Sequence, residues 1–121
     1  MNETILVVED QEDNRKILRD LLTNKGYKVI EVEDGYQGIQ QTLEHHPDLI
    51  LMDIQLPGID GYEVIRRIKN DTKISKIPII AVTSYALSGD SKKAFDAGCD
   101  GYVAKPYSPK KLLKMIQETL S

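Results

Sequence analysis

The amino-acid sequence predicts an α/β protein built on one parallel β-sheet with helices on both faces. Short aliphatic or β-branched runs alternate five times with amphipathic segments of helical length, a pattern typical of βαβ units. Charged or hydroxyl-bearing residues stand at the ends of four of these runs, and the carboxyl ends of parallel strands meet at one edge of a sheet. The 121 residues match one ordinary domain, residues 1–121, which can bury a core without disulfides.

The five apolar runs are the expected strands. The runs around Ile5, Leu49 and Ile79 are continuously apolar, as in strands covered by helices on both faces, whereas the run that begins at Lys28 contains charges and is typical of an edge strand. The expected strands are Thr4 to Glu9, Lys28 to Val32, Leu49 to Asp53, Pro78 to Val82 and Gly101 to Ala104.

Four of the five expected helices have an apolar face and a start or stop signal. The signals are a left-handed cap at Gly26 for the first helix, an N-cap at Asp34 for the second, a capping box of Asp60 and Glu63 for the third, and Ser108 before Pro109 for the last. The inward-facing residues are Ile17, Leu18, Leu21 and Leu22, then Ile39 and Leu43, then Val64, Ile65 and Ile68, and finally Leu112, Leu113, Ile116 and Leu120.

The remaining helix, between Leu87 and Gly98, has the weakest apolar face. Its apolar residues are Leu87, Ala94, Phe95 and Ala97, which offer little area for packing. We therefore expect this segment to be the element that shifts most readily.

Composition and charge exclude several classes of protein. The net charge of -3 leaves no basic stripe for nucleic acid, and no segment approaches the ~18 consecutive apolar residues of a membrane span. The start Met1-Asn2-Glu3 lacks the basic residues of a signal peptide, and the lone Cys99 excludes an internal disulfide. We expect a cytoplasmic protein that binds neither nucleic acid nor membrane.

Three acidic residues at the predicted sheet edge favour a magnesium site. Glu9 ends the first expected strand, Asp10 follows it, and Asp53 ends the third. Mg²⁺ prefers hard oxygen ligands and takes one or two protein carboxylates, whereas crowded carboxylates without a cation repel one another. We expect Asp10 to hold Mg²⁺ directly, Glu9 to hold it through water, and Gln55 to offer its backbone carbonyl.

We expect this site to bind a phosphoryl group. Asp53 stands alone at the tip of the expected central strand, and a carboxylate can attack phosphorus to form an aspartyl phosphate. Lys105 and Thr83 follow two other strands and can supply an ammonium and a hydroxyl for two phosphoryl oxygens. The magnesium would neutralise charge on the phosphoryl oxygens.

These residues, in this order, resemble the receiver domain of bacterial two-component response regulators, the CheY-like superfamily. The matching segments are Glu9-Asp10, Met52 to Gly58 with Asp60-Gly61, Thr83-Ser84, Ala97 to Tyr102, and Lys105-Pro106. The resemblance implies a flavodoxin-like (βα)5 fold with five parallel strands in the order 2-1-3-4-5. The chain ends at Ser121, just after the last helix, so we expect a stand-alone receiver that resembles the single-domain regulators of cell polarity. Receivers attached to hybrid histidine kinases share these segments, so a domain of a longer protein is the alternative.

The resemblance also implies a mechanism. Asp53 would take a phosphoryl group from a histidine kinase or phosphotransfer protein, with Mg²⁺ on Asp10, Asp53 and the Gln55 carbonyl. Thr83 and Tyr102 match the switch pair whose movement changes the surface of the fourth helix, the last strand and the last helix. The Lys105–Pro106 bond would be cis, and the downstream target is a protein that the sequence does not identify.

Three alternatives stay open at this point. A binding module could keep the fold and work without phosphorylation. A magnesium-dependent phosphatase would use the same aspartyl chemistry on other substrates, but Gln55 stands where its general acid is expected. A nucleotide-binding domain lacks its glycine-rich phosphate loop here. We expect no enzyme activity beyond the protein's own phosphorylation and dephosphorylation. Gln55 and Tyr85 stand two residues beyond Asp53 and Thr83, at positions that influence the lifetime of the phosphoryl group in the family, and the bulky Tyr85 would make self-dephosphorylation slow.

Overall fold

The computed structural model describes residues 2–84 and 90–121 and contains a five-stranded parallel sheet in the order β2-β1-β3-β4-β5. This order confirms the fold that the resemblance implied, with the charged strand β2 at one edge. Val8 pairs with Met52 and Asp53 with Val82, so the carboxyl ends of the strands lie side by side. The strands are β1 (Thr4–Val8), β2 (Lys28–Val32), β3 (Leu49–Asp53), β4 (Ile79–Thr83) and β5 (Gly101–Ala104).

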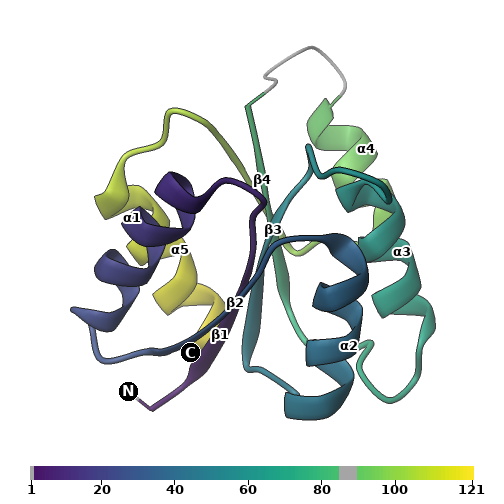
Figure 1. Ribbon diagram of the computed structural model, residues 1–121, viewed down its shortest axis with the longest axis horizontal. Helices are drawn as coiled ribbons and strands as arrows, with labels where there is room; N and C mark the ends of the chain where they lie inside the picture. Colours follow the sequence, from purple (N-terminus) through teal and green to yellow (C-terminus); the bar gives the residue numbers. More distant parts are fainter. Residues whose placement is uncertain (1, 85–89) are drawn as a thin grey trace.

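Helices cover both faces of the sheet, α1 and α5 on one face and α2, α3 and α4 on the other (Figure 1). Ile5 and Val7 of β1 belong to the core beneath α1 and α5, whereas Leu6 and Val8 belong to the core beneath α2, α3 and α4. This alternation follows from the two-residue period of a strand, and it explains why β3 and β4 are buried along their whole length. The helices are α1 (Glu12–Thr23), α2 (Gly35–His45), α3 (Gly61–Asn70), α4 (Asp90–Ala97) and α5 (Pro109–Leu120).

The two helices α1 and α5 pack against the sheet much as their sequences predict. Leu18, Leu22, Leu112 and Ile116 are buried in their shared core. The prediction was wrong for Ile17, which is 58% exposed, because it lies one residue, or about 100° of rotation, away from the buried stripe of its helix. Gly26 adopts a φ of 89° just after α1, as the predicted left-handed cap requires.

The two helices α2 and α3 begin at the predicted caps. The carboxylates of Asp34 and Asp60 accept hydrogen bonds from backbone N–H groups three residues on. Glu63 does not complete the predicted capping box, because its carboxylate pairs with the neighbouring arginines of α3 instead. Leu43 was predicted to face inward but is 38% exposed, since the smaller residues Gly38 and Thr42 form the buried face of α2.

The short helix α4 confirms the expectation of limited packing. Ala94 and Ala97 are buried, but Phe95 is 50% exposed and contributes little to the core. Leu87, the first apolar residue predicted for this helix, lies outside the described residues. Within the described part of the chain, none of the helices has the length and apolar character needed to cross a membrane.

Two strand boundaries differ from the prediction in a way that matters for the site. Strand β1 ends at Val8 rather than Glu9, so Glu9 stands just beyond the strand, although its N–H still donates to the carbonyl of Val32 (3.1 Å). Strand β4 runs from Ile79 to Thr83 rather than from Pro78 to Val82, since proline has no N–H to donate to a ladder. Thr83 is therefore the last residue of a fully buried strand.

Candidate functional site

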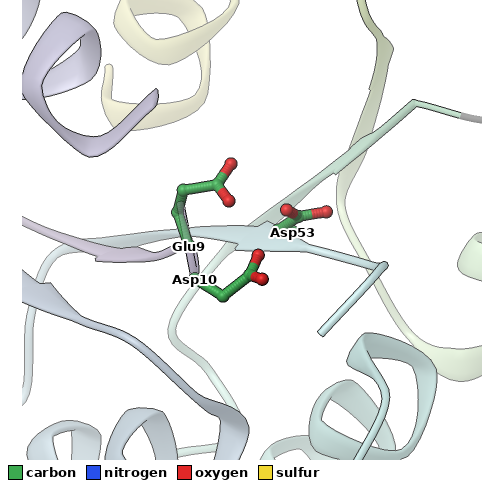
Figure 2. A group of neighbouring side chains, drawn as sticks. All are labelled: Glu9, Asp10 and Asp53. Atoms are coloured by element: carbon green, nitrogen blue, oxygen red, sulfur yellow. The ribbon is translucent and has the colours of Figure 1, made fainter. Parts of the chain in front are cut away.

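The three predicted acids lie together at the carboxyl edge of the sheet (Figure 2). Glu9 and Asp10 come from the connection after β1, and Asp53 is the last residue of β3. One carboxylate oxygen from each lies within 4.8 Å of the other two. Glu9 and Asp53 are almost fully buried, whereas Asp10 is more open to solvent. The topology thus brings the predicted acid cluster together.

Lys105 supplies the positive charge of the cluster. Its Nζ lies 2.9 Å from Oε1 of Glu9 and 3.5 Å from Oδ2 of Asp53. The backbone holds the lysine in place, because its N–H donates to the carbonyl of Thr83 (2.7 Å). The following bond to Pro106 is cis, as the resemblance implied. Burial opposes the charge of Lys105, but the carboxylates of Glu9 and Asp53 outweigh burial and raise its pKa.

Both carboxylate oxygens of Glu9 have partners within the protein. Oε1 accepts from Lys105, and Oε2 accepts from the N–H of Gln11 at 3.1 Å. Burial alone would raise the pKa of Glu9, but these two donors outweigh burial and hold the pKa below its usual value. Glu9 is therefore the carboxylate that stays ionised beside the lysine.

The pKa of Asp53 is shifted in the opposite direction from that of Glu9. Its Oδ1 accepts from the N–H of Gln55 at 3.0 Å, but burial and the nearby charge of Glu9 raise its pKa to about 7. Burial and Glu9 also raise the pKa of Asp10. Two of the three acids thus carry an electrostatic cost that one lysine does not remove, and a divalent cation would remove it.

The residues present fit a magnesium ion. Three carboxylates supply hard oxygen atoms within 4.8 Å of one another. Among the described residues, no other three acidic, histidine or cysteine side chains lie close enough together to share an ion. Asp10 is the most open of the three, which leaves room for the water ligands that Mg²⁺ keeps.

The two predicted switch residues lie on neighbouring strands. Thr83 ends β4 and is 1% exposed, and Tyr102 lies on β5 beside Ala81 of β4. The Tyr102 side chain is partly buried, and it packs against the core beneath α4 while it also lines a surface groove of about 640 Å³ with residues of α5. One aromatic ring therefore touches both the interior and the outer surface.

The side chain of Gln55 has a role that the sequence did not indicate. Its Nε2 donates to Oγ1 of Thr83, and its Oε1 accepts from the N–H of Ser84 at 2.9 Å. The glutamine thus joins the loop after β3 to the end of β4. The sequence singled out its backbone carbonyl and the influence of its position on phosphoryl lifetime, but not this contact, because the reach of a loop side chain toward another strand depends on the folded geometry.

Arg15 on α1 is a second residue that sequence reasoning missed. Its guanidinium donates to the carbonyl of Glu9 at 2.8 Å and also pairs with Glu33, the residue after β2, at 3.3 Å. The side chain is only 12% exposed, so it holds the backbone between the two acids of the cluster against β2. The signal available in the sequence was the pair of acids Glu31 and Glu33, which indicated an edge strand but not a partner on α1.

Comparison with known proteins decides the family. The sequence profile of the response regulator receiver domain matches residues 5–117. The chain belongs to this family. It is 42% identical over 120 residues to the polar-differentiation response regulator DivK of Brucella ovis, an alignment that covers 99% of this chain and 98% of the relative. The DivK protein of Brucella anthropi is 41% identical over the same length and coverage.

Solved receiver domains have the same fold. The receiver domain of the sensor histidine kinase PA1611 from Pseudomonas aeruginosa, solved with a magnesium ion coordinated in its active site cleft, is 36% identical. It has a TM-score of 0.92, with 99% of this chain and 98% of that chain covered. The signal receiver domain of a histidine kinase from Syntrophus aciditrophicus is 28% identical, with a TM-score of 0.91 and coverage of 98% and 89%. Receiver domains act in two-component signalling with histidine kinases and phosphotransfer proteins, and this chain is such a domain.

The raised pKa of Asp53 predicts an unusual pH dependence for the magnesium-free receiver. The folded protein holds the Asp53 proton to about pH 7, whereas the unfolded chain releases it near 3.8. The stability that this proton contributes is complete below about pH 4 and is lost as the pH rises through 7. We expect the free energy of unfolding to fall by about 2 to 4 kcal/mol across this window, relative to the Asp53→Asn variant.

Urea unfolding followed by circular dichroism, at pH values between about 5 and 8, measures this difference. The lowered pKa of Glu9 acts in the opposite direction, since its contribution is lost as the pH falls, and the variant retains that contribution. Saturating Mg²⁺ should remove the dependence because the cation stabilises the ionised carboxylates. Parallel stability curves for the two proteins without metal would contradict the prediction.

Proposed function

We propose that Asp53 is the phosphoacceptor of a magnesium-dependent receiver that takes its phosphoryl group from a histidine kinase or a histidine phosphotransfer protein. The observation that carries this proposal is the position of Asp53 at the tip of β3, with two other carboxylates and an ammonium around it. Membership of the receiver family and the magnesium ion in the Pseudomonas aeruginosa neighbour support it.

Each residue of the site has its own role in phosphoryl transfer. An Asp53 oxygen forms the new bond to phosphorus as the bond from phosphorus to the donor's nitrogen or oxygen breaks, and the donor leaves with the bonding electrons. Asp10, Asp53 and the Gln55 carbonyl would hold Mg²⁺, with Glu9 acting through water. When bound, Mg²⁺ neutralises the negative charge on the phosphoryl oxygens. Lys105 binds one of these oxygens, and the Thr83 hydroxyl binds another.

The output of this receiver is a change in partner affinity. Phosphorylation adds up to about two negative charges at Asp53, and Thr83 and Lys105 bind those charges better in one conformation than in the other. We propose that Tyr102 then turns inward and changes the surface of α4, β5 and α5. The contact of its ring with both the core and the groove beside α5 supports this route. The downstream target is a protein, the signalling is cytoplasmic, and the receiver acts on no other substrate.

Intact-mass measurement after incubation with Mg²⁺ and acetyl phosphate tests the proposal. We expect the gain of one phosphoryl group in the wild-type protein. The Asp53→Ala variant and a wild-type sample treated with a chelator should show no gain. Phosphorylation that persists in Asp53→Ala would place the acceptor elsewhere, and no gain in folded wild-type protein would favour a binding module that works without phosphorylation.

A further inference from the structure

The bridge made by the Gln55 side chain joins the two halves of the candidate site. Its backbone N–H donates to the Asp53 carboxylate (3.0 Å), while its side-chain amide contacts Thr83 and the N–H of Ser84. One residue therefore touches both the proposed phosphoacceptor and the hydroxyl that would bind the phosphoryl group.

The topology of the sheet makes this bridge possible. Strands β3 and β4 are neighbours, and Asp53 pairs with Val82, so Gln55, two residues beyond Asp53, lies close to Thr83 and Ser84, the two residues that follow Val82. Neighbouring strands lie about 4.8 Å apart, a distance that a glutamine side chain spans and that an asparagine, shorter by one methylene, spans less well.

Both ends of the amide are satisfied, which fixes its orientation. The N–H of Ser84 can only donate, so the atom that faces it must be the carbonyl oxygen Oε1, and the NH₂ group then faces Oγ1 of Thr83. A flipped amide would place two donors against each other at Ser84. The bridge thus holds the Thr83 hydroxyl and the following peptide group in one arrangement.

We propose that Gln55 is a positioning residue that holds Thr83 in its unphosphorylated position through the side-chain amide and thereby limits the response to phosphorylation. This inference rests on the proposed function of Asp53 and deepens it. For the Thr83 hydroxyl to move toward a phosphoryl group on Asp53, it must leave Nε2 of Gln55, and the movement of the adjoining peptide breaks the bond to Ser84. The two amide contacts therefore oppose the switch until phosphoryl contacts replace them.

The bridge itself is tested first, in unphosphorylated protein, by amide hydrogen exchange measured with NMR. In Gln55→Met, which keeps the length of the side chain but cannot bond, we expect the Ser84 N–H to exchange roughly 10-fold faster than in wild type. In the second variant, Gln55→Asn, the amide lies one methylene closer to the backbone and should reach Thr83 and Ser84 less well. The control Gln40→Met, on the exposed side of α2, should leave this exchange rate unchanged. Unchanged Ser84 exchange in both Gln55 variants would overturn the proposal.

The consequence for signalling is tested by the rate of phosphorylation with acetyl phosphate and Mg²⁺, followed by intact mass. We expect Gln55→Met to be phosphorylated about 3- to 10-fold faster than wild type, because more of the unphosphorylated protein already has Thr83 released. The Gln40→Met control should match wild type. A slower or equal rate in Gln55→Met would show that the amide does not restrain the switch and would overturn the proposal.

The two measurements separate failure of this inference from failure of the proposed function. If wild type gains no phosphoryl group, the proposed function is wrong, and the restraining role of Gln55 falls with it even if Ser84 exchange confirms the bridge. If wild type is phosphorylated on Asp53 and the Gln55 variants behave like Gln40→Met, only the role of Gln55 is wrong.

Discussion

Lys105→Met should destabilise the magnesium-free receiver by about 3 kcal/mol near neutral pH. The substitution keeps the length of the side chain but removes the ammonium that lies 2.9 Å from Glu9 and 3.5 Å from Asp53. Glu9 is 2% exposed, so without its counter-charge it must either stay ionised in a buried site or take up a proton well above its usual pKa, and both outcomes cost free energy. Loss of one partner from a buried ion pair is costly because the other charge stays desolvated.

Urea unfolding at about pH 7.5, with and without Mg²⁺, measures the loss. The matched control is Lys16→Met, because Lys16 is an exposed lysine of α1. The double variant Lys105→Met with Glu9→Gln should recover most of the stability, since it removes the unpaired carboxylate as well. Mg²⁺ should also reduce the loss. Equal stability of Lys105→Met and Lys16→Met without metal would refute the electrostatic account.

The strands and the site were predictable because both follow from local patterns along the chain. Continuous apolar runs around Leu49 and Ile79 indicated buried parallel strands, and the structure buries β3 and β4 completely. Since parallel strands present their carboxyl ends at one edge, residues after separate strands could be assigned to one site before their distances were known. Asp10 and Asp53, more than forty residues apart in the sequence, are the clearest example.

The helix faces were less predictable, because the sequence shows how far an apolar stripe extends but not how much of it the sheet covers. Ile17 and Leu43 lie at the margins of their stripes and are exposed at 58% and 38%. In α2 the buried positions are taken by Gly38 and Thr42, which let the helix approach β1 closely. Close approach of a helix to a sheet depends on small residues that hydrophobic periodicity does not detect.

Side-chain contacts across elements were the part that the sequence could not provide. The amide of Gln55 and the guanidinium of Arg15 both reach elements distant in the sequence, and their targets include backbone groups. A backbone carbonyl or N–H carries no residue-specific signal, so neither contact leaves a motif. Thr83 and Lys105, in contrast, were identifiable because Thr83 ends one apolar strand and Lys105 directly follows another.

Gly61→Ala should destabilise the protein by about 2 to 4 kcal/mol and also impair the site. A Cβ at Gly61 would lie 2.5 Å from the carbonyl oxygen of Asp53 and 2.6 Å from Cα of Ile54, so it would meet backbone rather than a flexible side chain. The N–H of Gly61 also donates to the carbonyl of Ile54 at 3.0 Å, which holds the start of α3 against the end of β3. Relief of the clash must therefore move either α3 or the peptide that carries Asp53.

This double effect distinguishes Gly61 from other glycines of the protein. Gly58→Ala is the matched control, because no atom lies within 4 Å of a Cβ there, and its cost comes only from a φ of 76°. We expect urea unfolding to show the larger loss for Gly61→Ala, and acetyl phosphate with intact mass to show slower phosphorylation even at temperatures where the variant is fully folded. If Gly61→Ala folds and is phosphorylated at the wild-type rate, then α3 moves to relieve the clash and Asp53 stays in place. The position of Asp53 would then depend on the sheet alone, and the close contact with α3 would serve only stability.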